Sequence, residues 1–201
     1  IPLCAARVQL QPLLHAGEFI VCDRARDLLV ELCTTEHAVS LVALWHSRLP
    51  RCQRGPWMYA FRAQKDGQTF AVALWNNPSA RTLPGHWLEL RRLAAAPDSP
   101  RNTCSYFMAR MASWLSKNHP EHERLISYQD CSVHTGTIYK AANWTVGLVS
   151  KPRTRDRSVN RVGTSRAYRS SLNGIDADGA AMVRWEYLLR TRQPHHEENG
   201  R

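Results

Sequence analysis

Short apolar runs separated by polar turns occur along most of the chain, and they predict strands joined by a few helices. In the first half, the runs bounded by turn residues, as expected of strands, are 28–33, 57–63, 70–75 and 87–96. Between residues 36 and 47 the apolar positions instead recur every three or four residues, which predicts a helix with one buried face. The tetrapeptide Lys65–Gln68 predicts a hairpin turn between the second and third strands.

The second half of the chain predicts a helix between two strands, followed by a short helix and further strands. A break at Pro97–Pro100 precedes a helix over 103–117, whose expected buried stripe is Phe107, Met111, Trp114 and Leu115. The elements that follow are a strand at 125–128, a short helix at 135–142 and strands at 145–149 and 181–189, the last of which closes the sheet. A strand, a crossover helix and a second strand form a unit in which the two strands are parallel.

Composition divides the chain into a core, two flanking segments and an insertion. Residues 28–190 carry the periodic pattern and predict one domain, because 201 residues with 43% hydrophobic content can bury a full core. Residues 1–27 lack a clear period, and we expect them to form an N-terminal extension outside that core. We expect residues 151–180 to form an exposed basic insertion and residues 191–201 to be a disordered tail.

Positive charge is the compositional feature that bears most on partners. The net charge is +10 and the isoelectric point is about 9.8, which favours DNA as a partner and also suits an acidic cofactor. The alternative is a basic surface that binds neither. The arginines expected to contact nucleic acid lie after the first helix and in the basic insertion: Arg51, Arg54, Arg153, Arg155, Arg157 and Arg161.

Other features of the composition bear on location. No apolar run reaches the roughly eighteen residues that span a bilayer, so no membrane association is expected. The opening residues lack the pattern of a signal peptide, and the missing initial Met predicts a truncated or processed start. The six cysteines contain no Cys-x-x-Cys pair, which predicts a reduced, cytoplasmic protein.

Candidate chemistry lies in the loop before the central helix and in the segment after the next strand. Residues 101–105 read Arg-Asn-Thr-Cys-Ser, and such a helix N-terminus suits a phosphate because its backbone N–H groups are unpaired. Asp130 and His134 follow the end of a strand, where ligands bind in open α/β sheets. Either can act as a general base, or both can hold a metal. The alternative is that Asp130 is a turn residue and His134 caps the short helix.

Three further polar residues allow two interpretations each. His46 ends the first helix, where it either forms part of a cleft for the acceptor substrate or interacts with the helix dipole. Glu89 and Arg91 alternate with leucines on the predicted strand 87–96. They either lie beside a cofactor groove or form a cross-strand ion pair.

The order strand, Pro-Asp turn, small-residue loop, helix, strand and Ile138–Trp144 resembles the core of the GCN5-related N-acyltransferases (GNAT). The resemblance implies an α/β (α+β) fold, with a GNAT-like mixed, mostly antiparallel sheet of six to seven strands flanked by helices and splayed beside the central helix. In that superfamily the later segment reads Leu-Tyr-x-x-x-Gly-Phe and its tyrosine acts as general acid, a role that falls here to Tyr139. The loop binds the pyrophosphate of acyl-CoA, which implies that acetyl-CoA or another acyl-CoA is held by Arg101, Asn102, Thr103, Cys104 and Ser105.

Two departures from the GNAT pattern are themselves informative. The loop ends Asn-Thr-Cys-Ser without glycine, and His-Thr-Gly-Thr-Ile-Tyr precedes Ala-Ala-Asn-Trp. Both are similar to the Mom-type phage proteins, which modify adenine in phage DNA, and the resemblance covers residues 28–189. It implies a transferase that places an acyl-CoA-derived group on a base amino group, with Tyr139, Asp130 and His134 as catalytic residues. A site for Fe or Mn at Tyr128, Asp130 and His134 is a further implication.

Two other functions remain open at this point. One is an ordinary N-acetyltransferase that acts on a small amine or a protein, which leaves the basic insertion unexplained. The other is a non-enzymatic nucleic-acid-binding domain on the same fold, because a loop without glycine departs from the usual cofactor loop.

Overall fold

The computed structural model describes residues 20–46, 52, 57–131, 134–151 and 181–189. Every element expected from the sequence is present, with ends within two residues of the expected ones. The elements are η1 (Ala25–Asp27), β1 (Leu29–Leu32), α1 (Thr35–Trp45), β2 (Tyr59–Lys65), β3 (Gln68–Asn76), β4 (Trp87–Ala95), α2 (Thr103–Asn118), β5 (Arg124–Asp130), α3 (Thr137–Ala141), β6 (Thr145–Ser150) and β7 (Met182–Leu188). None of the helices in these ranges is long and apolar enough to cross a membrane.

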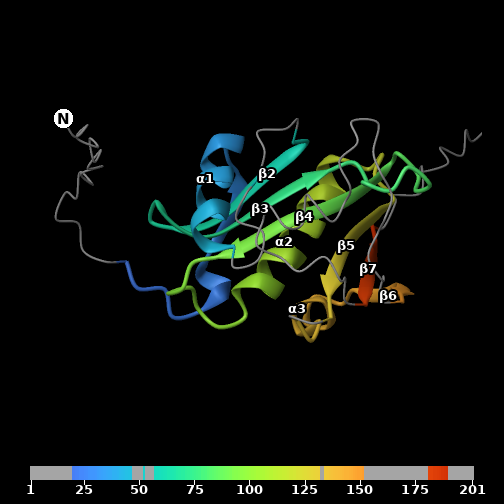
Figure 1. The fold of residues 1–201 in the computed structure, drawn as a ribbon. Helices are drawn as coiled ribbons and strands as arrows, with labels where there is room; N and C mark the ends of the chain where they lie inside the picture. The colour runs from blue at the N-terminus through green and yellow to red at the C-terminus, as the bar shows by residue number, and fades with distance from the viewer. Residues whose placement is uncertain (1–19, 47–51, 53–56, 132–133, 152–180, 190–201) are drawn as a thin grey trace, which may run out of the picture.

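The strands form one mixed sheet in the order β1-β2-β3-β4-β5-β7-β6, with helices on both sides (Figure 1). Strands β4 and β5 are parallel, as expected for the two strands that α2 connects. The other neighbouring pairs in the described sheet are antiparallel. The predicted mixed, mostly antiparallel sheet flanked by helices is therefore confirmed.

The position of β7 differs from the expected one, because this strand lies inside the sheet instead of closing it. It pairs with β5 on one side and with β6 on the other. Trp185 of β7 is buried in the main core, whereas Val146, Leu148 and Val149 of β6 are largely exposed. The strand that carries the aromatic residues therefore takes the interior position, and β6 forms the edge.

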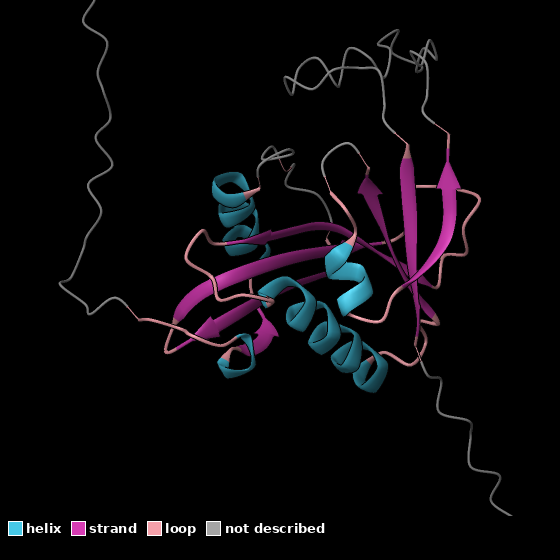
Figure 2. Cartoon of the chain, turned by 90° about the horizontal axis from the view of Figure 1, so that it is seen from below, coloured by secondary structure: helices cyan, strands magenta, loops and turns pink. Residues whose placement is uncertain are grey.

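Two cores lie on opposite faces of the sheet, as Figure 2 shows from the positions of α1 and α2. The larger core joins α2 and α3 to the sheet, and its fully buried residues include Trp75, Phe107 and Leu115. The smaller core lies under α1, where Ala38 and Val42 pack on β2, β3 and β4. Thr34 caps the N-terminus of α1, because its hydroxyl oxygen accepts a hydrogen bond from the backbone N–H of His37.

The end of the expected N-terminal extension belongs to the core. Cys22 and Ala25 are buried, although they lie in the range 1–27 that was expected outside it. The hydroxyl of Tyr106 on α2 donates to the carbonyl oxygens of Arg26 and Leu28. These contacts fix the chain just before β1, so the packed part begins earlier than the sequence pattern indicates. A charged stretch has no apolar period, yet it can still bury single small residues.

The central helix supports the sheet, and its contribution can be measured with a matched pair of leucines. Leu115 on α2 is fully buried, whereas Leu44 on α1 is 76% exposed. We expect Leu115→Ala to lower the free energy of unfolding by about 2–5 kcal/mol, because it removes buried methyl groups and leaves a cavity. Leu44→Ala should change it by less than about 0.5 kcal/mol. Urea denaturation of both variants checks this, and equal effects would contradict the described packing.

Candidate active site

The sheet opens between β4 and β5. The two strands are paired over only four positions, from Trp87–Arg124 to Leu90–Ser127. Beyond these pairs β4 continues against β3, and β5 continues against β7. The two strands therefore diverge, as Figure 1 shows, and the splay expected beside the central helix is present.

A β-bulge lies on β4 just past the last of these pairs. Leu74 of β3 pairs with Arg92 and Trp75 pairs with Leu90, so Arg91 is an extra residue on β4. Before the bulge Leu90 faces the core under α2, and after it Leu93 faces that same core. The extra residue thereby turns Arg92 toward the α1 side of the sheet, opposite Leu74, which belongs to the smaller core.

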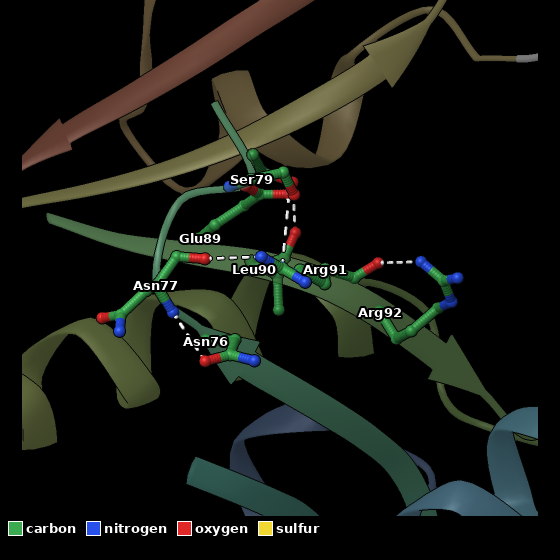
Figure 3. A network of polar contacts seen from close by, with 8 residues as sticks. Asn76, Asn77, Ser79, Glu89, Leu90, Arg91 and Arg92 are labelled. Atoms are coloured by element: carbon green, nitrogen blue, oxygen red, sulfur yellow. Dashed lines mark hydrogen bonds and ion pairs between the residues drawn. The ribbon is translucent and has the colours of Figure 1, made fainter. Parts of the chain in front are cut away.

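Polar contacts brace the bulge (Figure 3). The carboxylate of Glu89 is buried and accepts hydrogen bonds from Ser79, at 2.6 Å from its backbone N and 3.1 Å from its hydroxyl. Arg91 donates to the carbonyl oxygen of Asn77 at 2.7 Å, and its Nε lies 3.7 Å from Glu89 Oε1. Glu89 and Arg91 therefore form an ion pair along one strand. The cross-strand pair, which was one of the two interpretations, is wrong because both residues lie on β4.

A chain of hydrogen bonds closes the base of the opening. Ser127 Oγ donates to the carbonyl oxygen of Leu90 at 3.1 Å, and Tyr139 Oη lies 3.0 Å from the same Oγ. Because the single hydroxyl proton of Ser127 is used on Leu90, Tyr139 must be the donor to Ser127. The phenol proton of Tyr139 therefore lies at the point where the two strands separate.

Aromatic rings hold Tyr139 in this place. Its ring stacks on Trp185 at 5.2 Å between centroids and meets Trp144 edge-on at 5.9 Å. Tyr139 is only 8% exposed, and burial raises the pKa of its hydroxyl above the ordinary value of 10.0. Tyr139 is thus protonated at neutral pH, which suits a proton donor and excludes a phenolate base.

The approach of α3 to the sheet depends on Gly136. This residue precedes α3 with φ of 77°, a left-handed conformation. A Cβ there would lie 2.6 Å from Gln129 Oε1 and 2.7 Å from a ring carbon of Trp185. The amide of Gln129 is itself fixed, because it accepts from Trp185 Nε1 at 2.7 Å and donates to the carbonyl of His134. Gly136 therefore allows the close contact that seats Tyr139.

The N-terminus of α2 forms one wall of a pocket of ≈ 210 Å³. Asn102 precedes the helix in the left-handed region, and the first turn contains no acidic residue. Among the described residues, none accepts a hydrogen bond from the backbone N–H of Cys104 or Ser105. The pocket is lined by Ser99, Pro100, Asn102, Thr103, Cys104, Ser105, Thr137, Ile138 and Ala141, so it connects α2 to α3.

Four of the five residues predicted to bind the cofactor line this pocket, whereas Arg101 is exposed beside it. The hydroxyls of Thr103 and Ser105 donate to the backbone carbonyls of Pro100 and Asn102, at 2.7 and 3.1 Å. Burial raises the pKa of the Cys104 thiol, which therefore stays protonated at neutral pH. Backbone N–H groups, rather than charged side chains, are therefore the groups of this pocket that are suited to an anion.

Basic groups meet on the other face of the opening. His46 follows α1, and its pKa is lowered by burial, by the positive charge of Arg92 and by the neighbouring imidazole of His134. Arg92 donates to the carbonyl of Arg91 at 2.7 Å, and its buried Nε has no hydrogen-bond partner among the described atoms. The cluster joins three segments far apart in the chain, and it keeps His46 neutral at neutral pH.

Tyr139 and Asp130 lie on opposite faces of β5. Ser127 and Gln129 face α3, and side chains alternate along a strand, so Tyr128 and Asp130 face the α1 side. The backbone N–H of His134 donates to the carbonyl of Asp130 at 3.1 Å. The three residues predicted as catalytic are therefore divided between the two sides of the opening.

The metal expected at Tyr128, Asp130 and His134 stays a prediction. In the described ranges, the one group of three His, Cys, Asp or Glu side chains close enough to share an ion lies elsewhere. The arginines predicted to bind nucleic acid, which are Arg51, Arg54, Arg153, Arg155, Arg157 and Arg161, lie outside the described residues.

Sequence reasoning missed Ser127 and Arg92. Ser127 reads as an ordinary strand residue, and nothing in its neighbourhood indicates its bond to Tyr139. The sequence did contain a signal for the bulge that directs Arg92. The core-facing leucines of β4 change from even positions, at Leu88 and Leu90, to an odd position, at Leu93. Such a phase change between two polar residues is typical of a β-bulge.

Solved structures of acetyltransferases share this fold. One from Bacillus subtilis in complex with CoA has a TM-score of 0.54 at 13% identity, covering 81% of this chain and 99% of that one. A ribosomal-protein-S5-alanine acetyltransferase from Vibrio fischeri has a TM-score of 0.55 at 9% identity, covering 84% and 96%. A GNAT-family acetyltransferase from Streptococcus pneumoniae gives 0.52 at 9%, covering 81% and 99%. The chain thus has the fold of the GNAT acyltransferases.

The family is identified by sequence. The profile of the Mom protein family matches residues 27–179, which is most of the chain. The chain therefore belongs to the Mom protein family, on a GNAT fold. No curated protein matches the chain significantly.

The role of Gly136 can be separated from the general cost of a left-handed residue by comparison with Gly67. Gly67 also has a positive φ, of 88°, but a Cβ there would meet nothing within 4 Å. We expect Gly67→Ala to lower the free energy of unfolding by about 1–2 kcal/mol, the cost of the conformation alone. Gly136→Ala should cost about 1–3 kcal/mol more, because its methyl group overlaps Gln129 and Trp185. Equal losses in urea denaturation would show that α3 does not depend on this contact.

Proposed function

We propose that the protein transfers a group derived from an acyl-CoA to an amino group of a base in DNA. The observation that carries the proposal is the opening between β4 and β5, which has an anion pocket and Tyr139 on one face and basic groups on the other. Membership of the Mom protein family and the net charge of +10 support the same conclusion.

The pocket at the start of α2 suits the diphosphate of coenzyme A. An anion is favoured here by the backbone N–H groups of Cys104 and Ser105 and by the N-terminus of a helix of sixteen residues. The first turn of this helix also contains no acidic residue. The pocket's ≈ 210 Å³ is small beside whole-ligand pockets, so it suits one part of the cofactor. The Bacillus subtilis structure of the same fold contains CoA. When bound, an acyl-CoA would supply an activated thioester.

Tyr139 is the proposed general acid of the reaction. Its O–H donates to Ser127 and has to turn from that oxygen toward the leaving thiolate of the cofactor. Stacking on Trp185 holds the ring in place while the hydroxyl turns. Its raised pKa keeps the proton on the phenol until a stronger base, such as a thiolate released in an apolar environment, takes it.

The acceptor amino group is proposed to enter from the α1 side. There His46 is neutral at neutral pH, because its pKa is lowered, and it can accept a proton from the attacking amine. Asp130 lies on the face of β5 toward the α1 side and remains a candidate for the general base. His134, which is close to His46, is a third candidate. Arg92 supplies fixed positive charge that favours an approaching phosphate.

DNA is the proposed acceptor, with Arg51, Arg54 and the arginines of 151–180 as phosphate contacts. A base in a DNA duplex is stacked between its neighbours and cannot reach the opening between β4 and β5. We therefore infer that the target base leaves the stack before it reacts. An ordinary N-acetyltransferase and a non-enzymatic DNA-binding domain are the competing functions that the experiments below distinguish.

The pocket assignment predicts which substitutions abolish cofactor binding. Ser105→Glu and Thr137→Glu each place a carboxylate in the pocket, where it should repel the diphosphate. Thr137 is exposed, so its variant is expected to keep the fold even if Ser105→Glu does not. Ser40→Glu, on the exposed face of α1, is the control. Calorimetry with acetyl-CoA should detect binding only to the wild type and to the control. Unchanged affinity in Thr137→Glu would contradict the assignment.

Tyr139→Phe tests the proposed reaction, because it keeps the ring stack and removes the proton. We expect a fall in turnover of about a hundredfold or more, with acyl-CoA affinity unchanged. The measurement is mass spectrometry of nucleosides from DNA of cells that express each form. A new nucleoside adduct with the wild type, much reduced with the variant, supports the proposal. Unmodified DNA with acetylated amines would support the ordinary acetyltransferase, and no product of either kind would support the binding domain.

A further inference from the structure

A group of metal-binding side chains lies at the C-terminal end of α2, away from the opening in the sheet. His119, Glu121 and His122 come from the turn between α2 and β5, and their ligand atoms lie within 4.8 Å of one another. His119 Nδ1 is 2.9 Å and His122 Nε2 is 3.9 Å from the same oxygen, Glu121 Oε1. Helix α2 has 16 residues and is about 24 Å long, so this group is far from the pocket at its other end.

The ring of His122 is held so that one nitrogen faces the group. His122 is 5% exposed, and its Nδ1 lies 3.2 Å from the carbonyl oxygen of His86. A carbonyl only accepts, so Nδ1 carries the proton and Nε2 presents a lone pair toward Glu121. A backbone carbonyl that fixes the histidine tautomer in this way is typical of metal sites.

Tyr59 of β2 completes the surroundings. Its Oη lies 3.1 Å from His122 Nε2 and therefore donates to that lone pair. Its ring lies 4.7 Å from the ring of His119, and it also contacts Trp114 edge-on. The lone pair of His122 Nε2 is therefore shared between the phenol of Tyr59 and any other group that approaches this nitrogen.

We propose that His119, Glu121 and His122 form a binding site for a divalent transition metal of the zinc class. Two imidazoles and one carboxylate are a ligand set of Zn²⁺. Ligand atoms around a tetrahedral Zn²⁺ are about 3.3 Å apart, and the observed 2.9 and 3.9 Å lie on either side of this value. Glu121 has a side chain that is 60% exposed, so the ion can enter from solvent and a water molecule can complete the coordination.

The site would stabilise the turn between α2 and β5, which the carbonyl of His86 holds beside β4 through His122. His122 lies between β2, through Tyr59, and the carbonyl of His86 just before β4. A metal bound here connects His119, Glu121 and His122 within the turn after α2. It stabilises the folded state, because the unfolded chain does not hold the three ligands together. This role is independent of the proposed transfer reaction.

The experiment measures Zn²⁺ binding to the full chain after treatment with a chelator. We expect one Zn²⁺ per chain in calorimetry, and a melting temperature higher by roughly 5–10 °C at a hundredfold excess over Kd. Co²⁺ should give the visible absorption of a tetrahedral complex. His119→Gln and Glu121→Gln change exposed or half-exposed side chains, so they test binding without the loss of packing expected for His122→Gln. Each should weaken binding by more than about tenfold.

Two further variants make the assignment specific. His37→Gln, on α1, is the control and should bind Zn²⁺ like the wild type. Tyr59→Phe removes the hydroxyl that competes for His122 Nε2, so affinity should be equal or higher. Binding that persists in His119→Gln and Glu121→Gln, loss of binding in Tyr59→Phe, or no binding to the wild type would each overturn the proposal.

Discussion

The separation of β4 from β5 after the pair Leu90–Ser127 is the constraint on which the candidate site depends. Peptide groups in a sheet need hydrogen-bond partners, so a gap between strands must be filled by side chains, solvent or a ligand. Ser127 donates its hydroxyl to the carbonyl of Leu90, the last residue of β4 that pairs with β5, and Tyr139 in turn donates to Ser127. The opening is therefore closed at its base by side chains and is free to receive a ligand above it.

This arrangement brings opposite chemical properties to the two faces of one sheet. On the α2 side, backbone N–H groups at the start of a helix and a buried, protonated phenol suit an anionic cofactor and its leaving group. On the α1 side, burial lowers the pKa of His46, and the charge of Arg92, which the bulge at Arg91 turns toward this face, lowers it further. A two-substrate reaction needs such a separation, because the donor and the acceptor must approach the same point without competing for space.

Several contacts in the main core position Tyr139. Its ring lies between Trp144 and Trp185, and Gln129 holds Trp185 through a hydrogen bond of 2.7 Å. Gly136 is needed because any side chain would overlap this arrangement. The buried carboxylate of Glu89 has partners in Ser79, so the bulge on β4 is braced rather than strained by a lone buried charge.

The sequence by itself determined every β-strand and α-helix to within two residues, because apolar periodicity and turn residues act over short distances, whereas the short 3-10 helix η1 was not predicted. It also indicated the small-residue loop and Tyr139 through their resemblance to known motifs. Only the tertiary structure decided that β7 lies inside the sheet, that Asp130 and Tyr139 face opposite sides of β5, and that Ser127 holds Tyr139. These features depend on strand order and on contacts between elements far apart in the chain, and neither leaves a periodic signal in the sequence. Contacts between residues as far apart as Tyr59 and His122 are likewise set by the packing of whole elements.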